Sequence, residues 1–264
     1  MDRHDSRPKP AAPRVGFFVT CLANAMRPSV AFASVKLLLR AGCRVEVPEG
    51  QVCCGQPAFN SGDTEGTRAI ARQVIALFEG YDHVVGPSGS CMATIRHHYP
   101  GLFADEPAWR ERAQRLAERS WELTSFLVDV MGVEDVQAQL NAQATYHDSC
   151  SGLRELGIKQ QPRRLLKSVR GLELTEMKDS ETCCGFGGTF CVKYPEISAK
   201  MVDDKAARVQ QSGADVLVGG DLGCLLNMAG RLKRLGRDTR VYHVAEVLAG
   251  VGDTPGIGDA AEAR

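Results

Sequence analysis

The stretch Cys183-Cys184-Gly185-Phe186-Gly187-Gly188 has a shorter counterpart earlier in the chain, Cys53-Cys54-Gly55. One cysteine precedes each vicinal pair and another follows it, at intervals that nearly repeat. Eight of the ten cysteines therefore fall into two matching sets. The first set contains Cys21, Cys53, Cys54 and Cys91, and the second contains Cys150, Cys183, Cys184 and Cys224. This repetition predicts a duplicated unit whose cysteines share one purpose.

The composition limits the classes of protein that the chain can be. Its 264 residues, 44% of them hydrophobic and 24% charged, can bury the core of one large domain or two ordinary ones. Lysine plus arginine equals aspartate plus glutamate at 32 each, so no excess charge favours nucleic acid or an anionic membrane surface. We therefore expect a soluble globular protein that does not bind nucleic acid.

We expect the N-terminal residues to be neither a secretory signal nor a membrane anchor. Residues 1–13 are polar and lack the apolar core of a secretory signal, and residues 251–264 are rich in glycine, alanine and aspartate. We expect both ends to be disordered tails. No apolar run approaches the roughly 20 residues that a membrane helix needs, so we expect a cytoplasmic protein without direct membrane insertion. In that reducing compartment, cysteines stay as thiols unless they bind metal or perform redox chemistry.

Short apolar segments precede the cysteines of both sets. Strands are expected at residues 14–20, 44–47, 81–86, 144–149, 172–177 and 214–219. Segments with helical periodicity separate them, and this alternation is typical of parallel α/β units. Each cysteine then follows the carboxyl end of a strand, which is the edge where such sheets bind ligands.

The segment between the two halves has a different pattern. In residues 104–130, large apolar side chains recur every seven residues among arginine and glutamate, which predicts one or two helices that close the first half. We therefore expect two α/β domains, at residues 14–131 and 132–250, each a small and mainly parallel sheet flanked by helices.

Clustered cysteines can bind zinc or an iron–sulfur cluster. Zinc sites usually show two Cys-x-x-Cys knuckles, and none is present. Adjacent side chains on extended backbone diverge, which suits a polynuclear cluster better than a single ion. Each set supplies four thiols, the ligand number of an ordinary iron–sulfur cluster, so we expect one of the 4Fe-4S type. A zinc-bound structural or regulatory protein stays an alternative.

Glycines next to the vicinal cysteines have a physical use at such a site. Without a side chain, the backbone can approach a cluster closely and its N–H groups can hydrogen-bond the sulfurs. On this argument the cofactor-binding glycines are Gly55, Gly185, Gly187 and Gly188. The same run lacks the spacing of a nucleotide-binding loop.

Other residues near the cysteines have simpler interpretations. We interpret His147 as a hydrogen-bonded histidine at a strand end, and Cys43 and Cys191 as packed thiols outside the sites. Arg27 and Arg154 follow the first cysteine of each set and could offset the negative charge of thiolate-bound clusters. No catalytic residue is identified.

Four segments of the second half carry a family resemblance: His147-Asp148-Ser149-Cys150, residues 184–190, residues 192–195 and Gly223-Cys224-Leu225-Leu226-Asn227. With the doubled Cys-Cys-Gly element, the chain resembles the cysteine-rich CCG domain proteins from residue 14 to about residue 250. That family includes a component of heterodisulfide reductase, the iron–sulfur components of glycolate oxidase and anaerobic glycerol-3-phosphate dehydrogenase, and lactate-utilisation proteins. The resemblance implies two tandem duplicated CCG domains that bind iron–sulfur clusters.

Within the family, the chain looks most like the lactate-utilisation branch, because it has no ferredoxin-type cysteine segment. This resemblance implies an electron-transfer subunit of a complex that oxidises L-lactate to pyruvate, with a ferredoxin-like iron–sulfur protein and one further protein of the complex as partners. The heterodisulfide reductase relatives carry a fifth cysteine where this chain has Thr94 and Asn227. A heterodisulfide-reductase-like or glycolate-oxidase-like role, or thiol exchange by the vicinal cysteines, stays an alternative.

Overall fold

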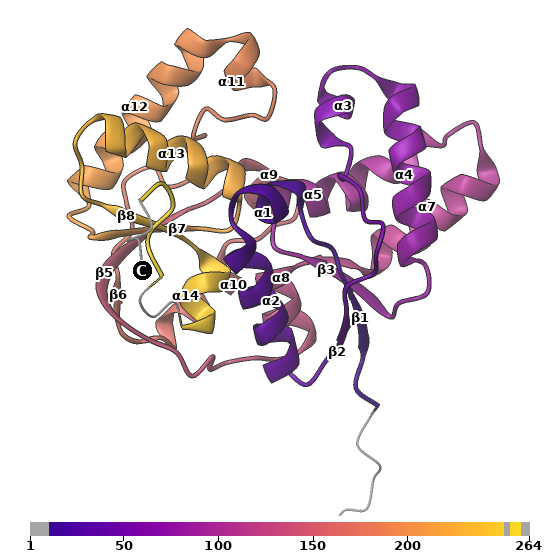
Figure 1. Cartoon of the computed structure of the whole chain (residues 1–264), viewed down its shortest axis with the longest axis horizontal. Coiled ribbons are helices and arrows are strands. Elements are labelled where there is room, and N and C mark those ends of the chain that lie inside the picture. The colour runs from indigo at the N-terminus through magenta and orange to yellow at the C-terminus, as the bar shows by residue number, and fades with distance from the viewer. Residues whose placement is uncertain (1–10, 251–253, 260–264) are drawn as a thin grey trace, which may run out of the picture.

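The computed structural model describes residues 11–250 and 254–259 and contains two four-stranded sheets (Figure 1). The first comprises β1 (Arg14–Phe17), β2 (Arg44–Glu46), β3 (His83–Gly86) and β4 (Ser120–Glu122). The second comprises β5 (Gln139–His147), β6 (Arg170–Leu174), β7 (Val216–Gly219) and β8 (Arg240–His243). Their strand orders are β2-β1-β3-β4 and β6-β5-β7-β8, and every pairing is parallel. The duplicated α/β fold is thereby confirmed.

Helices connect the strands in the same sequence in both halves. The first half contains α1 (Cys21–Met26), α2 (Pro28–Arg40), α3 (Gln56–Asn60), α4 (Thr64–Phe78) and α5 (Gly89–Ala93). The second half contains α9 (Cys150–Arg154), α10 (Gln160–Lys167), α11 (Phe190–Lys193), α12 (Pro195–Gln211), α13 (Leu222–Arg234) and α14 (Val244–Ala249). Local sequence explains their starts: Asp63 accepts a hydrogen bond from the Gly66 N–H to cap α4, and Pro28 opens α2.

The segment between the halves is more varied than the sequence predicts. After η1 (Thr94–His98) and α6 (Tyr99–Leu102) comes the expected long helix α7 (Pro107–Arg119). Strand β4 then completes the first sheet, before α8 (Leu123–Ser125) and η2 (Phe126–Val130). The helices-only prediction for residues 104–130 is therefore wrong at β4, because three residues are too few to show a strand pattern.

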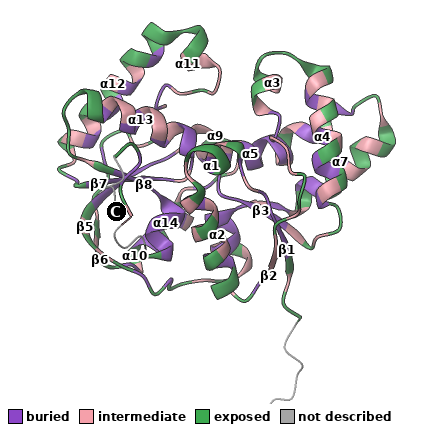
Figure 2. Cartoon of the chain, viewed as in Figure 1, coloured by how far each residue is buried: buried purple, intermediate pink, exposed green. Residues whose placement is uncertain are grey.

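The two halves share one hydrophobic core. Helix α2 of the first half packs against α14 of the second, while α10 of the second packs against α8 and η2 of the first. A single cluster joins Phe17, Leu38 and Phe126 to Tyr146 and Leu166. All six residues of α14 are buried in the interior (Figure 2). The expected division into domains at residues 131 and 132 stays a prediction, since the packing is continuous there.

The end of the described chain returns to the second sheet. Within the stretch expected to be a disordered tail, residues 254–259 are described, and Ile257 is buried with its N–H bonded to the Val241 carbonyl at 2.7 Å. The rest of that stretch and residues 1–10 lie outside the described residues. No helix in the described part of the chain has the length and apolar character required to span a bilayer.

Candidate metal centres

The fold places each cysteine at the carboxyl edge of its own sheet. Cys21 and Cys150 are the first residues of α1 and α9, just after β1 and β5. The vicinal pairs lie in the loops that follow β2 and β6. The last cysteines lie near the N-termini of α5 and α13, after β3 and β7. Three separate chain segments therefore supply the four thiols of each set.

Within each set the thiols lie close enough to shift one another's pKa. In the first, the Cys21 and Cys53 sulfurs lie 3.9 Å apart, and Cys54 is within hydrogen-bonding reach of both Cys53 and Cys91. The second repeats this chain of contacts, from Cys150 through Cys183 and Cys184 to Cys224. The structure thus brings all eight expected ligands together as two groups of four.

Two cysteines stay outside these groups, as expected from the sequence. Cys43 is buried in the shared core. The Cys191 thiol donates to the Gly188 carbonyl at 3.2 Å. The two repeated sets therefore consist of the eight cysteines that share the same spacing in both halves.

The thiols within a set cannot all ionise without a cation. The hydrogen bond from Cys21 lowers the pKa of Cys53 to about 2, and the bond from Cys150 lowers the pKa of Cys183 to about 2. The same contacts, helped by burial, raise the pKa of the neighbouring thiols Cys21, Cys54, Cys150 and Cys184. A bound metal would supply the positive charge that lets the other sulfurs become thiolates. The donor set fits an iron–sulfur cluster, which needs four such sulfurs.

The glycines after the vicinal pairs have backbone conformations that favour glycine. Gly55 and Gly185 have φ of +82° and +83°. The Gly185 N–H donates to the Cys183 sulfur at 3.4 Å, which is the role expected from the sequence. A Cβ at Gly185 would lie 2.7 Å from the Ser198 carbonyl oxygen of α12, so a larger residue would push the loop from the helix. Gly187 and Gly188 also have positive φ.

A side chain fixes the carbonyl of the buried cysteine in each pair. The Tyr99 hydroxyl donates to the Cys54 carbonyl at 2.8 Å, and the Asn227 side-chain amide donates to the Cys184 carbonyl at 2.9 Å. Asn227 therefore positions the second loop from the place where heterodisulfide reductase relatives carry a fifth cysteine. Thr94, the matching residue of the first half, donates instead to the Ser90 carbonyl at 2.9 Å. The role of Tyr99 was not evident from the sequence.

The second set faces a cavity between the halves. A cleft of about 250 Å³ is lined by Cys150, Cys183, Cys184 and Cys224 on one side. Residues of α3, α5 and η1 from the other half line the opposite side. In Figure 1, α11 and α3 lie on either side of the region where α9 meets α5. The second centre is thus open to a small molecule or to a partner's side chain, and none of the first four cysteines lines this space.

His147 differs from its sequence interpretation. The side chain is 1% exposed, and neither ring nitrogen has a hydrogen-bond partner among the described residues. One ring nitrogen and the sulfurs of Cys184 and Cys224 all lie within 4.8 Å of one another. Burial lowers the pKa of His147 to about 3, so the imidazole is neutral. His147 is therefore a buried imidazole beside two cysteines, and it lacks the well-formed hydrogen bond expected of a strand-end histidine, although the Ser180 backbone is near enough to affect its pKa.

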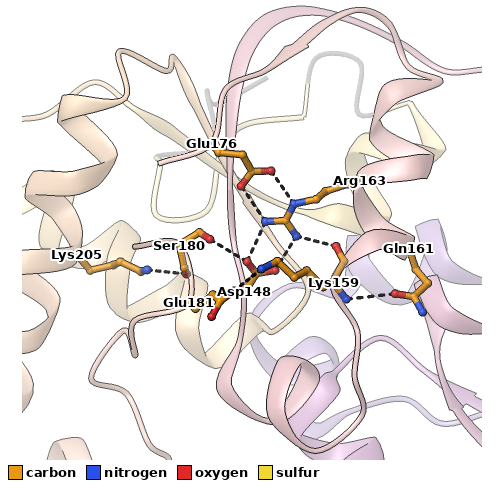
Figure 3. Close-up of polar contacts among 8 residues, drawn as sticks. All are labelled: Asp148, Lys159, Gln161, Arg163, Glu176, Ser180, Glu181 and Lys205. Carbon is orange, nitrogen blue, oxygen red and sulfur yellow. Dashed lines mark hydrogen bonds and ion pairs between the residues drawn. The ribbon is translucent and has the colours of Figure 1, made fainter. Parts of the chain in front are cut away.

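A partly buried network holds the loop that leads to Cys183 (Figure 3). Arg163 binds Asp148 at 2.8 Å and Glu176 at 2.6 Å, and the Ser180 hydroxyl donates to Asp148 at 3.1 Å. Lys205 donates to the Ser180 carbonyl at 2.8 Å, and burial lowers its pKa to about 8. Apart from Asp148, which lies in a segment that carries the family resemblance, no motif in the sequence identified these residues, because only the fold brings them together.

The two arginines considered from the sequence have different surroundings. Arg27 pairs with the buried Glu246 at 2.7 Å and donates to the Pro255 carbonyl at 2.7 Å, so it joins the two halves. Arg154 lines a surface depression together with Cys183, and its charge favours the thiolate of Cys150. Of the two, Arg154 is the one placed to offset charge at a centre.

Comparisons with known proteins agree with this geometry. The family model described as CCG, cysteine-rich domain, matches residues 15–96 and 144–229. The chain is 51% identical to lactate utilization protein A of Bacillus licheniformis over 235 residues, which cover 89% of this chain and 98% of that protein. The protein of the same name from Bacillus subtilis (strain 168) is 48% identical with the same coverage.

Among solved structures, the fold is similar to a hypothetical protein from Helicobacter pylori, with a TM-score of 0.65 and 12% identity. The match covers 93% of this chain and 51% of that one, so this chain spans about half of that protein's length. The likeness concerns the fold alone. The two matched segments, the doubled cysteine sets and the extended identity to curated relatives together show that the chain belongs to the cysteine-rich CCG domain family.

Proposed function

We propose that this protein is the iron–sulfur electron-transfer subunit of a cytoplasmic complex that oxidises L-lactate to pyruvate. The observation that carries the proposal is the pair of four-thiol groups, each assembled from three chain segments at a sheet edge. The curated relatives, about half identical over nearly their whole length, are named for lactate utilisation.

Each group would hold one cluster of the 4Fe-4S type. The first would be bound by Cys21, Cys53, Cys54 and Cys91, and the second by Cys150, Cys183, Cys184 and Cys224. Bound clusters would supply reversible one-electron transfer. The protein's own part is to hold the thiols in contact, to exclude water around the buried Cys54 and Cys184, and to donate the Gly185 N–H to sulfur.

The two ends of the electron path are proposed to be different. Cys21 is exposed, so the first centre reaches the surface and suits exchange with a protein partner. The second centre opens on the cleft between the halves. The partners we propose are a ferredoxin-like iron–sulfur protein and one further protein of the lactate-utilising complex.

Anaerobic purification tests this proposal directly. We expect iron and acid-labile sulfide in amounts that account for two clusters, together with a paramagnetic signal on reduction. Zinc without iron would refute the proposal and favour the structural alternative. Co-purification of the chain with its two proposed partners tests the complex. Addition of lactate to that complex should then reduce the clusters chemically, so that the paramagnetic signal appears.

One observation favours a second candidate function, thiol exchange at the second centre. The pKa of Cys183 is lowered to about 2 by the hydrogen bond from Cys150, and this cysteine lines the cleft. Alkylation that removes activity but leaves the iron content unchanged would support exchange. Alkylation that removes iron and activity together would support the cluster.

A further inference from the structure

The residue three positions before the first cysteine differs between the halves. Phe18 precedes Cys21, and His147 precedes Cys150. Phe18 is fully buried and packs on Phe78, with ring centroids 5.6 Å apart. An aromatic ring therefore fits this place in the fold without any polar partner.

His147 is buried in the same way but carries two nitrogens that need partners. A buried polar group without a hydrogen bond destabilises a protein, whereas phenylalanine at this place would not. Among the described residues, neither ring nitrogen forms a well-aligned hydrogen bond, and the Ser180 backbone is a polar group near enough to affect the pKa of the ring. The sulfurs of Cys184 and Cys224 are its neighbours: each pair among these two sulfurs and one ring nitrogen is separated by at most 4.8 Å.

This distance is somewhat longer than the distance between donors that share a metal. Two donors on one tetrahedral metal, with bonds of about 2.0 to 2.3 Å, lie roughly 3.5 Å apart. A separation of up to 4.8 Å therefore needs only a small adjustment when a metal binds. Imidazole nitrogen is also a recognised ligand of iron in mixed cysteine and histidine clusters.

We propose that His147 is a nitrogen ligand of the cluster bound by the second cysteine set, so that the two centres differ in their ligands. The inference rests on the proposed function, because both need a cluster at that set. His147 would add a fifth donor to the second set. Asn227 cannot supply that donor, because its side-chain amide is bonded to the Cys184 carbonyl.

The surroundings of the second set have a consequence for the direction of electron flow. The imidazole is neutral, so its addition leaves the charge of the thiolate-bound cluster unchanged. The buried Lys205 near the second set raises the reduction potential of that cluster, because a cation stabilises its reduced, more negative form. Electrons would therefore move from the first centre to the second, which faces the cleft.

Pulsed electron paramagnetic resonance can detect a metal-bound nitrogen. The measurement uses the full chain with Cys54→Ser, in which the second set is intact and the first is not. We expect the reduced cluster to show a strong nitrogen coupling that changes pattern when the protein is labelled with ¹⁵N-histidine. A cluster with only the weak coupling of a hydrogen-bonded nitrogen would overturn the inference.

Two variants identify the histidine. His147→Phe introduces the residue that the first half carries, and His147→Cys restores a metal donor without nitrogen. In the Cys54→Ser background, both should lose the strong coupling, and His147→Cys should keep its iron. A coupling that survives in His147→Cys would overturn the assignment. If His147→Phe does not fold, the labelled Cys54→Ser protein and His147→Cys still decide.

The result separates this inference from the proposed function. Iron in both halves without a bound nitrogen would refute the ligand alone. No iron in either half would refute both. A redox titration gives an independent measure: the second centre should be reduced at a more positive potential than the first, and His147→Cys should lower it. Equal potentials in the two centres would also count against the inference.

Discussion

The two halves have the same topology but surround their cysteines with different chemistry. Near the first set the structure places Phe18 and Val74, both buried and apolar. The matching residues near the second set are His147 and Lys205. Val74 and Lys205 occupy matching positions in the two halves. Thr67 lies beside Gly55 and Ser198 lies beside Gly185, and Val74 and Lys205 each follow that residue by seven positions. The backbone was thus duplicated more faithfully than the environment of the sulfurs.

The loops before the vicinal pairs show the same contrast. In the first half, Gln51 fixes the loop by accepting from the Val19 N–H and donating to the Phe17 carbonyl. In the second, Arg163 and Asp148 do so with charges. Neutral amide bonds position the first loop at small electrostatic cost, whereas the buried ion pair must compensate its own desolvation. The comparison indicates an apolar, surface-reaching first centre and a polar, cleft-facing second one.

Removing one buried cysteine should affect only its own half. In separate variants, Cys54→Ser and Cys184→Ser should each lose about half of the iron, because each set forms contacts within itself. Iron quantitation after anaerobic purification checks this, with Cys43→Ser as the matched control that keeps all its iron. Loss of all iron in either variant would mean that the two sets build one shared site.

Removing the arginine of the second loop should give the largest loss of stability. Arg163→Met leaves the Asp148 carboxylate buried without its partner, which should lower the free energy of unfolding by about 3–5 kcal/mol. Gln51→Leu in the first half should cost about 1–3 kcal/mol, because it leaves two backbone groups unpaired. Urea unfolding followed by circular dichroism compares them. Equal losses of unfolding free energy in the two variants would show that the charged network stabilises its loop no more than the Gln51 amide stabilises the other.

The helix that follows the last strand of each sheet begins with a titratable capping residue. The two capping residues contribute to stability with opposite dependence on pH. Glu122 caps α8, and burial raises its pKa to about 7. His243 caps α14, and burial lowers its pKa. Because the folded state holds the Glu122 proton more tightly, the stability from this group is present at low pH and is lost as pH rises from about 4.5 to about 7. The stability from His243 is present above its unfolded pKa and is lost as pH falls.

Unfolding at pH 5 and pH 8 tests this contrast. As the pH rises from 5 to 8, the wild-type chain should lose unfolding free energy relative to Glu122→Gln, by at most about 3 kcal/mol. A difference that does not depend on pH would show that the Glu122 carboxyl titrates normally in the fold.

The smallest effect is expected at the carbonyl of the buried cysteine. Tyr99→Phe removes the hydroxyl that donates to the Cys54 carbonyl and should cost about 1–2 kcal/mol, with retention of iron in the second half. Asn227→Leu removes the equivalent bond at Cys184. If either change released iron from the opposite half, the separation of the centres would be wrong.

The sequence predicted the parts of the fold that depend on local pattern. The cysteine register and the strands before each cysteine follow from short segments, and the structure has them. Strand β4 was missed because three residues carry no periodicity. Lys205 and Arg163 belong to helices where charged residues are common, and only tertiary packing shows that they are buried. The unpaired nitrogens of His147 likewise become evident only from its neighbours.

The packing of helices across the two halves has a consequence for how the chain unfolds. Because α14 packs on α2 and α10 packs on α8, opening one half exposes apolar surface of the other. The two sheets should therefore unfold in a single cooperative transition, although their cysteine sets are separate. A single unit cut from this chain would have an uncovered apolar face, which a second copy of itself could cover with two-fold symmetry.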